Sequence, residues 1–201
     1  MFFIKTINAE NAEGKLKQIY QRVAGPDGKI DHILISHSLR PHTLEGHMRL
    51  YKNVLHHSAN TLEKSQLEAL GVYVSMLNQC SYCVEHHFQG YKKLINDDER
   101  AEAVRQAMKQ QTLSDVFTER ELTLFHYAKK LTLKPASIVE EDIKEMRQGG
   151  FDDGEILEVN QVVAYFNYAN RTVLGLGVTL EKSGIGLSPN DNDDEENWGH
   201  K

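Results

Sequence analysis

The only two cysteines of this 201-residue chain, Cys80 and Cys83, stand three positions apart. His87 follows the second cysteine by four residues. A thiol is a good nucleophile only as the thiolate, so its chemistry depends on neighbours that lower the cysteine pKa. Two such neighbours are expected: a helix N-terminus at Cys80, and His87 one helical turn from Cys83. The pattern predicts a dithiol redox site with an acid–base imidazole.

Glu68 joins this site if the helices on either side of Asn78-Gln79 form a hairpin. Glu68 and His87 then lie at similar distances from the bend, so the carboxylate can orient the imidazole toward Cys83. A helix N-terminus alone would favour Cys80 as the nucleophile, whereas the spacing to His87 favours Cys83. We therefore predict that Cys83 attacks an oxidant and that Cys80 condenses with the resulting sulfenic acid to a disulfide.

Two other interpretations of the cysteines remain open. They could form half of a zinc site with His86 or His87, although no second cysteine pair exists to complete it. They could also be inert core residues, since buried cysteine is common. His86 points about 100° away from His87 on a helix, so it is given a secondary role.

Four further histidines recur at five-residue steps: His32, His37, His42 and His47. Five-residue steps do not share one helical face, and Pro41 interrupts the series. We interpret these histidines as unrelated to one another and not as a metal site.

The scaffold is predicted to be all-α, with roughly eight helices and no convincing strand, because apolar residues recur at helical spacing almost throughout. The first expected helix begins at Asn8 or Asn11 and ends at Ala24. Further helical segments are expected at 30–39, 41–57, 63–77, 80–94, 96–110, 118–131, 137–150 and from 152 onward. Capping boxes are predicted at Thr118-x-x-Glu121, Ser137-x-x-Glu140 and Asp152-x-x-Glu155. Residues 1–187 are expected to form a single domain, and the acidic segment 188–201 a disordered tail.

Composition excludes several classes of protein. The formal net charge is −6 and no basic patch is visible, so nucleic-acid binding is not expected. No apolar run approaches the roughly 20 residues of a membrane span, and the N-terminus does not resemble a signal peptide. A cytoplasmic protein is therefore predicted, in which a Cys-x-x-Cys pair favours redox chemistry over a structural disulfide.

Glu68 followed by Cys80-x-x-Cys83-x-x-x-His87 resembles the active-site signature of alkyl hydroperoxidase D, in the carboxymuconolactone decarboxylase superfamily. The wider chain, over most of residues 8–180, looks like the peroxidase-related branch of that superfamily. The flanking matches are Ser38-Leu39-Arg40-Pro41, Leu50-Tyr51, Asn78 before the cysteines, His86-His87, Phe166-Asn167-x-x-Asn170-Arg171 and Gly175-Leu176-Gly177-Val178.

The resemblance implies an all-helical alkyl hydroperoxidase D-like fold, assembled as a homo-oligomer of three or six subunits, with no cofactor or metal. It implies reduction of small hydroperoxides, with Cys83 as the peroxidatic thiol, Cys80 as proton donor and resolving thiol, and Glu68 and His87 as the proton relay. The reductant would be a dithiol, such as a lipoyl-bearing or thioredoxin-like protein. The alternatives are a decarboxylase-like enzyme using Glu68 and His87 as an acid–base pair, or a non-catalytic zinc-binding or helical assembly module.

Overall fold

The computed structural model describes residues 2–182, 184–194 and 196–200. Over these residues the secondary structure is helical, which confirms the predicted class, although nine α-helices are present where roughly eight were predicted. The helices are α1 (Gly14–Val23), α2 (His32–Ser36), α3 (Pro41–Leu55), α4 (Lys64–Leu77), α5 (Ser81–Ile95), α6 (Asp98–Gln110), α7 (Glu119–Leu133), α8 (Glu140–Gln148) and α9 (Asp153–Leu176). Short 3-10 turns lie at Ala9–Asn11, Leu113–Asp115 and Pro135–Ser137.

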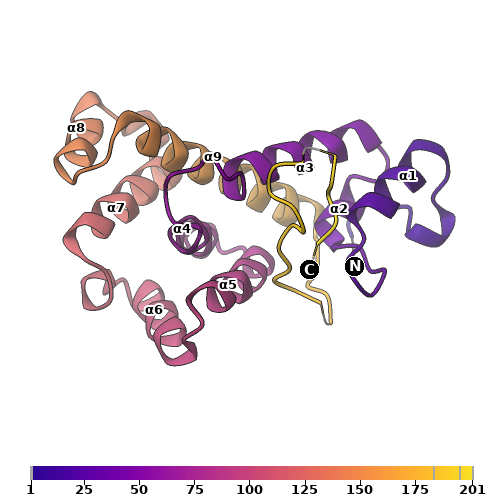
Figure 1. Cartoon of the computed structure of the whole chain (residues 1–201), viewed down its shortest axis with the longest axis horizontal. Coiled ribbons are helices and arrows are strands. Elements are labelled where there is room, and N and C mark those ends of the chain that lie inside the picture. The colour runs from indigo at the N-terminus through magenta and orange to yellow at the C-terminus, as the bar shows by residue number, and fades with distance from the viewer. Residues whose placement is uncertain (1, 183, 195, 201) are drawn as a thin grey trace.

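Helix α4 is the centre of the molecule. Every residue from Leu67 to Ser75 is buried, as expected for a helix that is largely apolar around its circumference. Its neighbours are α5, α7 and α9, and Figure 1 shows α4 almost end-on between them. The partner that matters most for function is α5, which follows α4 after a three-residue bend, 78–80, and packs along it as the predicted hairpin.

Two of the three predicted capping boxes are present, at Thr118 and at Asp152. The third is wrong. Pro135 opens a 3-10 turn in which the Ser137 hydroxyl donates to the carbonyl of Lys134 at 2.7 Å, so Ser137 is not free to cap a helix. Helix α8 begins at Glu140, and the Asp142 carboxylate accepts the backbone N–H of Val139 at 2.7 Å.

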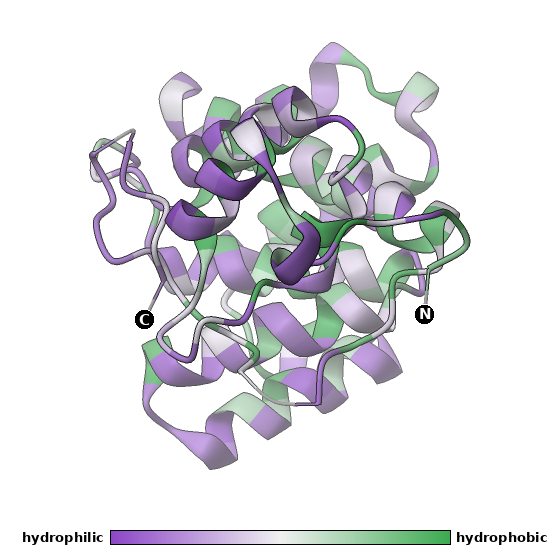
Figure 2. Ribbon diagram, turned by 90° about the vertical axis from the view of Figure 1, so that its right-hand side faces the viewer, coloured by the Kyte–Doolittle hydropathy of each residue, from purple (hydrophilic) through white to green (hydrophobic). Residues whose placement is uncertain are grey.

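The C-terminal segment differs from the predicted disordered tail in the residues that are described, 188–194 and 196–200. Figure 2 shows that it is mostly hydrophilic and crosses the outside of the helices. Trp198 nevertheless lies in a buried cluster with residues of α1 and α3, and the buried ammonium of Lys52 donates to the carbonyls of Asp194 and Asn197. The Trp198 side chain and the carbonyls that bind Lys52 therefore hold this segment against the helices, although its composition indicates disorder.

Among the helices in the described ranges, none has the combination of length and hydropathy needed to cross a membrane.

Candidate active site

The bend between α4 and α5 places the cysteines. Asn78 is the C-cap of α4, and Gln79 adopts a left-handed conformation with φ of 58°, which turns the chain back on itself. Cys80 is the N-cap of α5, and its backbone N–H donates to the carbonyl of Ser75 at 2.9 Å. Cys80 therefore lies at a helix N-terminus, as the sequence predicts, and Cys83 lies in the first turn.

Two asparagines of α9 hold this bend. The Asn78 amide donates to the side-chain oxygens of Asn167 at 3.0 Å and of Asn170 at 2.9 Å. Asn170 is fully buried and donates to the Ser75 hydroxyl at 3.0 Å. The sequence did not reveal whether these asparagines line a pocket or an interface. In the structure they are internal braces, because they hydrogen-bond the side chains of Asn78 and Ser75, which lie directly before the Cys-x-x-Cys motif.

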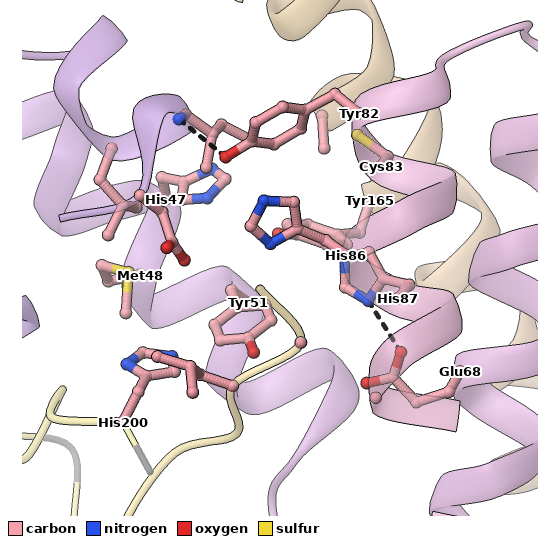
Figure 3. Close-up of a pocket in the computed structure, with 17 residues that line it drawn as sticks. His47, Met48, Tyr51, Glu68, Tyr82, Cys83, His86, His87, Tyr165 and His200 are labelled. Atoms are coloured by element: carbon pink, nitrogen blue, oxygen red, sulfur yellow. Dashed lines mark hydrogen bonds and ion pairs between the residues drawn. The ribbon is translucent and has the colours of Figure 1, made fainter. Parts of the chain in front are cut away.

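Glu68 and His87 form the hydrogen-bonded pair that the hairpin geometry predicts. Glu68 Oε2 lies 2.8 Å from His87 Nδ1, and the two side chains are 6% and 16% exposed (Figure 3). The edge of the His87 ring meets Phe166 at a centroid distance of 4.5 Å. Gly90 packs against the Glu68 carboxylate, since a Cβ at this position would lie 3.5 Å from it, in ordinary van der Waals contact. Because Nδ1 of His87 is hydrogen-bonded to Glu68, Nε2 is the ring nitrogen that can exchange a proton with a substrate.

The two thiols are reduced and buried, but only Cys83 lines the pocket described below. The Cys83 thiol, and after it the Cys83 backbone N–H, donate to the Cys80 sulfur and lower the pKa of Cys80 against the opposing effect of burial. The same thiol–thiol hydrogen bond, together with burial, raises the pKa of Cys83, although Asn170 acts in the opposite direction. In the reduced site the first proton is therefore lost from Cys80.

The order in which the two thiols lose their protons differs from the Glu68–His87–Cys83 relay predicted from the sequence. In the described part of the chain no hydrogen bond joins His87 to either sulfur, so the imidazole is coupled to Glu68 and faces the pocket rather than a thiol. Cys80 is the thiol that ionises more easily, and Cys83 is the one that a small molecule in the pocket can reach.

A second carboxylate–imidazole pair lies beside the first, and sequence reasoning missed it. His86 Nε2 is 2.7 Å from Oε2 of Glu181, and the Tyr82 hydroxyl donates to Oε1 of Glu181 at 2.8 Å. The backbone N–H of His32 also donates to Glu181. Burial acts to raise the pKa of Glu181, but these hydrogen bonds and the His86 charge lower it to about 2. Nothing in the local pattern around Glu181 indicates this contact, which spans 95 positions of sequence.

The pocket at Cys83 is lined by residues of α2, α3, α4, α5, α9 and the C-terminal segment (Figure 3). His47 lines it, although the sequence placed that histidine in an unrelated series. Its Nδ1 is buried without a hydrogen-bond partner among the described residues, and burial lowers its pKa to about 3. Tyr51 and Tyr165 add aromatic surface on the same side. A small cavity with convergent polar groups is the usual form of a ligand site.

The described residues around Cys80 and Cys83 do not form a set of zinc ligands. Within the described ranges no group of three or more histidine, cysteine or acidic side chains is arranged to hold a metal ion.

No protein-family model matches this sequence, and no curated protein sequence does either. Solved structures do match. The chain is similar to the alkylhydroperoxidase AhpD core of an uncharacterized peroxidase-related protein from Ralstonia eutropha JMP134, at a TM-score of 0.77 and 19% identity over 90% of this chain and 93% of that one. This chain has the AhpD-like fold. An uncharacterized peroxidase-related protein from Silicibacter sp. TM1040 matches at a TM-score of 0.69 and 24% identity, over 77% of this chain and 78% of that one.

The AhpD-like fold is not confined to peroxidase-related proteins. The debrominase Bmp8, solved as a cysteine-to-alanine variant with 2,3,4-tribromopyrrole, matches at a TM-score of 0.68 and 15% identity, over 90% of this chain and 92% of that one. The structural neighbours thus confirm the fold expected from the sequence, while the activity has to be argued from the site.

Proposed function

We propose that this protein is a thiol-dependent peroxidase that reduces hydroperoxides with Cys83 and Cys80. The observation that carries the proposal is the placement of Cys83 on a small pocket that also receives the Glu68–His87 pair, with Cys80 buried directly behind it. A nucleophile, an acid–base group and a resolving thiol are the three components that dithiol peroxide reduction requires.

The reaction begins with a proton transfer between the thiols. Cys80 loses its proton more readily than Cys83, and the Cys83 thiol donates its S–H to the resulting thiolate. When a hydroperoxide occupies the pocket, the Cys83 proton passes to Cys80, and the Cys83 thiolate faces the substrate. Cys80 thus acts as the base that activates its neighbour, which assigns it the proton-handling role implied by the family resemblance.

The Cys83 thiolate then attacks the terminal peroxide oxygen. The O–O bond breaks, a sulfenic acid forms on Cys83, and the departing alkoxide takes a proton from Nε2 of His87, whose Nδ1–H is held by Glu68. Cys80 attacks the sulfenic sulfur, the disulfide forms, and the hydroxide leaves as water with the Cys80 proton. An external dithiol returns the disulfide to two thiols, so that one hydroperoxide and one dithiol give one alcohol, one water and one disulfide.

Peroxide consumption by the purified protein with dihydrolipoamide or dithiothreitol tests this proposal. We expect turnover by the wild type, and loss of turnover to the background rate in Cys83→Ser. Equal activity of the wild type and Cys83→Ser would refute the assignment.

An acid–base enzyme is the second candidate, because His87 is bonded to Glu68 and to neither sulfur in the described residues. Such an enzyme would use the pair to move a proton during decarboxylation or lactone opening. The double variant Cys80→Ser/Cys83→Ser separates the two: decarboxylase activity that survives in it selects the second candidate, whereas peroxide reduction that disappears in it selects the first.

A further inference from the structure

The pocket at Cys83 is completed by the chain that follows α9. We define the C-terminal arm as residues 177–182, 184–194 and 196–200. Three of its residues, Gly186, Leu187 and His200, line the pocket together with the helices. In Figure 1 the arm folds back alongside α3 and α2 instead of leaving the molecule.

Glu181 fixes the start of the arm to the cysteine helix. Its carboxylate accepts hydrogen bonds from the Tyr82 hydroxyl and from the backbone of His32, and pairs with His86. Tyr82 and His86 flank Cys83 in sequence, and their rings stack at a centroid distance of 4.4 Å. The side chain of Glu181 is only 10% exposed, so this is a buried, multiply bonded contact rather than a surface ion pair.

Gly186 brings the arm onto α5 at close range. It has a φ of 70°, and a Cβ there would lie 2.3 Å from Cβ of Gln89 and 3.1 Å from the backbone nitrogen of Gly90. The Gly186 carbonyl accepts a hydrogen bond from the Lys93 ammonium at 2.7 Å. Only glycine permits this approach, which seats the arm directly over the turn of α5 that covers Glu68.

The end of the arm is held by charge and by aromatic packing. The Lys52 ammonium is buried beneath it and donates to two of its carbonyls. Arg22 donates to the carboxylate of Glu196 and lies 3.7 Å from the Trp198 ring centroid. His200 stacks on Tyr51, a pocket residue of α3, at 5.8 Å and 21°. Removal of the arm would leave the Lys52 charge without these carbonyl partners, so the docked position has a defined energetic basis.

The pocket that the arm lines is small. Its volume is about 60 Å³, less than half that of the roughly 150 Å³ apolar cavity known to bind benzene. That space accommodates hydrogen peroxide or a short-chain hydroperoxide, but not an aryl or long-chain one.

We propose that the C-terminal arm, pinned by Glu181 and Gly186, limits the substrates of this site to hydrogen peroxide and short-chain hydroperoxides, with Leu187 and His200 as the specificity-determining side chains. The substrate class named here rests on the proposed peroxidase function. The size limit on molecules that reach Cys83 does not, and it is open to measurement without turnover.

The matched variants are Leu187→Ala, which shortens a side chain on the pocket wall, and Leu180→Ala, which makes the same change on the arm away from it. With dithiothreitol as reductant, we expect the wild type to prefer hydrogen peroxide to cumene hydroperoxide in kcat/KM. Leu187→Ala should shift the ratio toward cumene hydroperoxide by about tenfold, Leu187→Ala/His200→Ala should shift it further, and Leu180→Ala should leave it unchanged. Equal rates for both peroxides in the wild type, or the same ratio in all four proteins, would overturn the size limit.

The second readout is the rate of Cys83 alkylation, followed by peptide mapping. The rate with iodoacetamide, a small reagent, is compared with the rate with a bulky pyrene maleimide. The wild type should discriminate against the maleimide more strongly than free glutathione does, and Leu187→Ala should lose much of that discrimination. If no peroxide is consumed but alkylation discriminates by size, the peroxidase proposal fails and the size limit stands. If peroxides are consumed while Cys83 discriminates no more than glutathione, the size limit fails and the peroxidase proposal stands. Circular dichroism and limited proteolysis of each variant establish that the arm remains docked.

Discussion

Oε2 of Glu68 on α4 accepts a hydrogen bond from Nδ1 of His87 on α5 at 2.8 Å. Nineteen positions of sequence separate these residues, and the hairpin bend brings them together. The carboxylate fixes the imidazole tautomer with the proton on Nδ1 and stabilises the imidazolium that must protonate the leaving group.

Replacement of Glu68 by glutamine should therefore lower kcat for peroxide reduction by about 10²-fold, because the amide keeps the size of the side chain but removes its charge. Steady-state kinetics with saturating dithiol measure this effect. Glu63→Gln, at the exposed N-cap of the same helix, is the matched control and should be neutral. A Glu68→Gln enzyme with wild-type kcat would show that the pair is structural.

The two cysteines should differ in their products. After one equivalent of hydroperoxide, the wild type should hold a Cys80–Cys83 disulfide, and Cys80→Ser should hold a sulfenic acid on Cys83 that dimedone traps. Cys83→Ser should give neither product, because the remaining thiol is fully buried and does not line the pocket. Mass mapping of the dimedone adduct decides the assignment; an adduct on Cys80 would reverse the roles of the thiols.

The ionisation of Cys80 should depend on Cys83. Donation from the Cys83 thiol lowers the pKa of Cys80, so Cys83→Ala should raise the pH at which the Cys80 thiolate appears. An ultraviolet titration of thiolate absorbance, with the double variant as baseline, measures this change. The same midpoint in the wild type and in Cys83→Ala would mean that the helix N-terminus alone sets the Cys80 pKa.

Gly71 controls the position of Phe166, the ring that backs His87. A Cβ at position 71 would lie 2.1 Å from Cζ of Phe166, in the most buried part of α4. Gly71→Ala should lower the free energy of unfolding by roughly 1–3 kcal/mol, the usual cost of overpacking a core, and should lower kcat through the displaced ring. Gly46→Ala, at a helical site with open space around it, should instead stabilise the protein by about 0.5–1 kcal/mol. Urea denaturation of both variants provides the comparison.

Burial of neutral His47 should make stability depend on pH. Burial lowers its pKa to about 3, below its ordinary value of 6.5, so the unfolded chain takes up a proton that the folded chain does not. The contribution is complete above the ordinary value and is lost as the pH falls toward about 3. Between about pH 7.5 and pH 5, the wild type should lose about 2 kcal/mol more than His47→Asn. Equal losses in both proteins, measured by urea denaturation, would place His47 in contact with solvent.

Much of the scaffold was predictable because it depends on local patterns. Apolar spacing placed the α4–α5 hairpin, and side-chain caps placed the starts of α7 and α9. The predicted Ser137 box was wrong because Ser137 belongs to a 3-10 turn that Pro135 opens, in which its hydroxyl donates to the Lys134 carbonyl. Only residues 188–201 were expected to be disordered. That prediction came from the average composition of the segment, which does not reveal that one tryptophan, Trp198, is buried.

For the site, the sequence by itself determined the chemical types and the hairpin that pairs Glu68 with His87, because both follow from spacing along two adjacent helices. Only the tertiary structure decided which thiol faces the pocket, which ionises first, and that His47, Glu181 and His200 belong to the same site. These properties depend on burial and on contacts between segments far apart in the chain, and no local pattern encodes them.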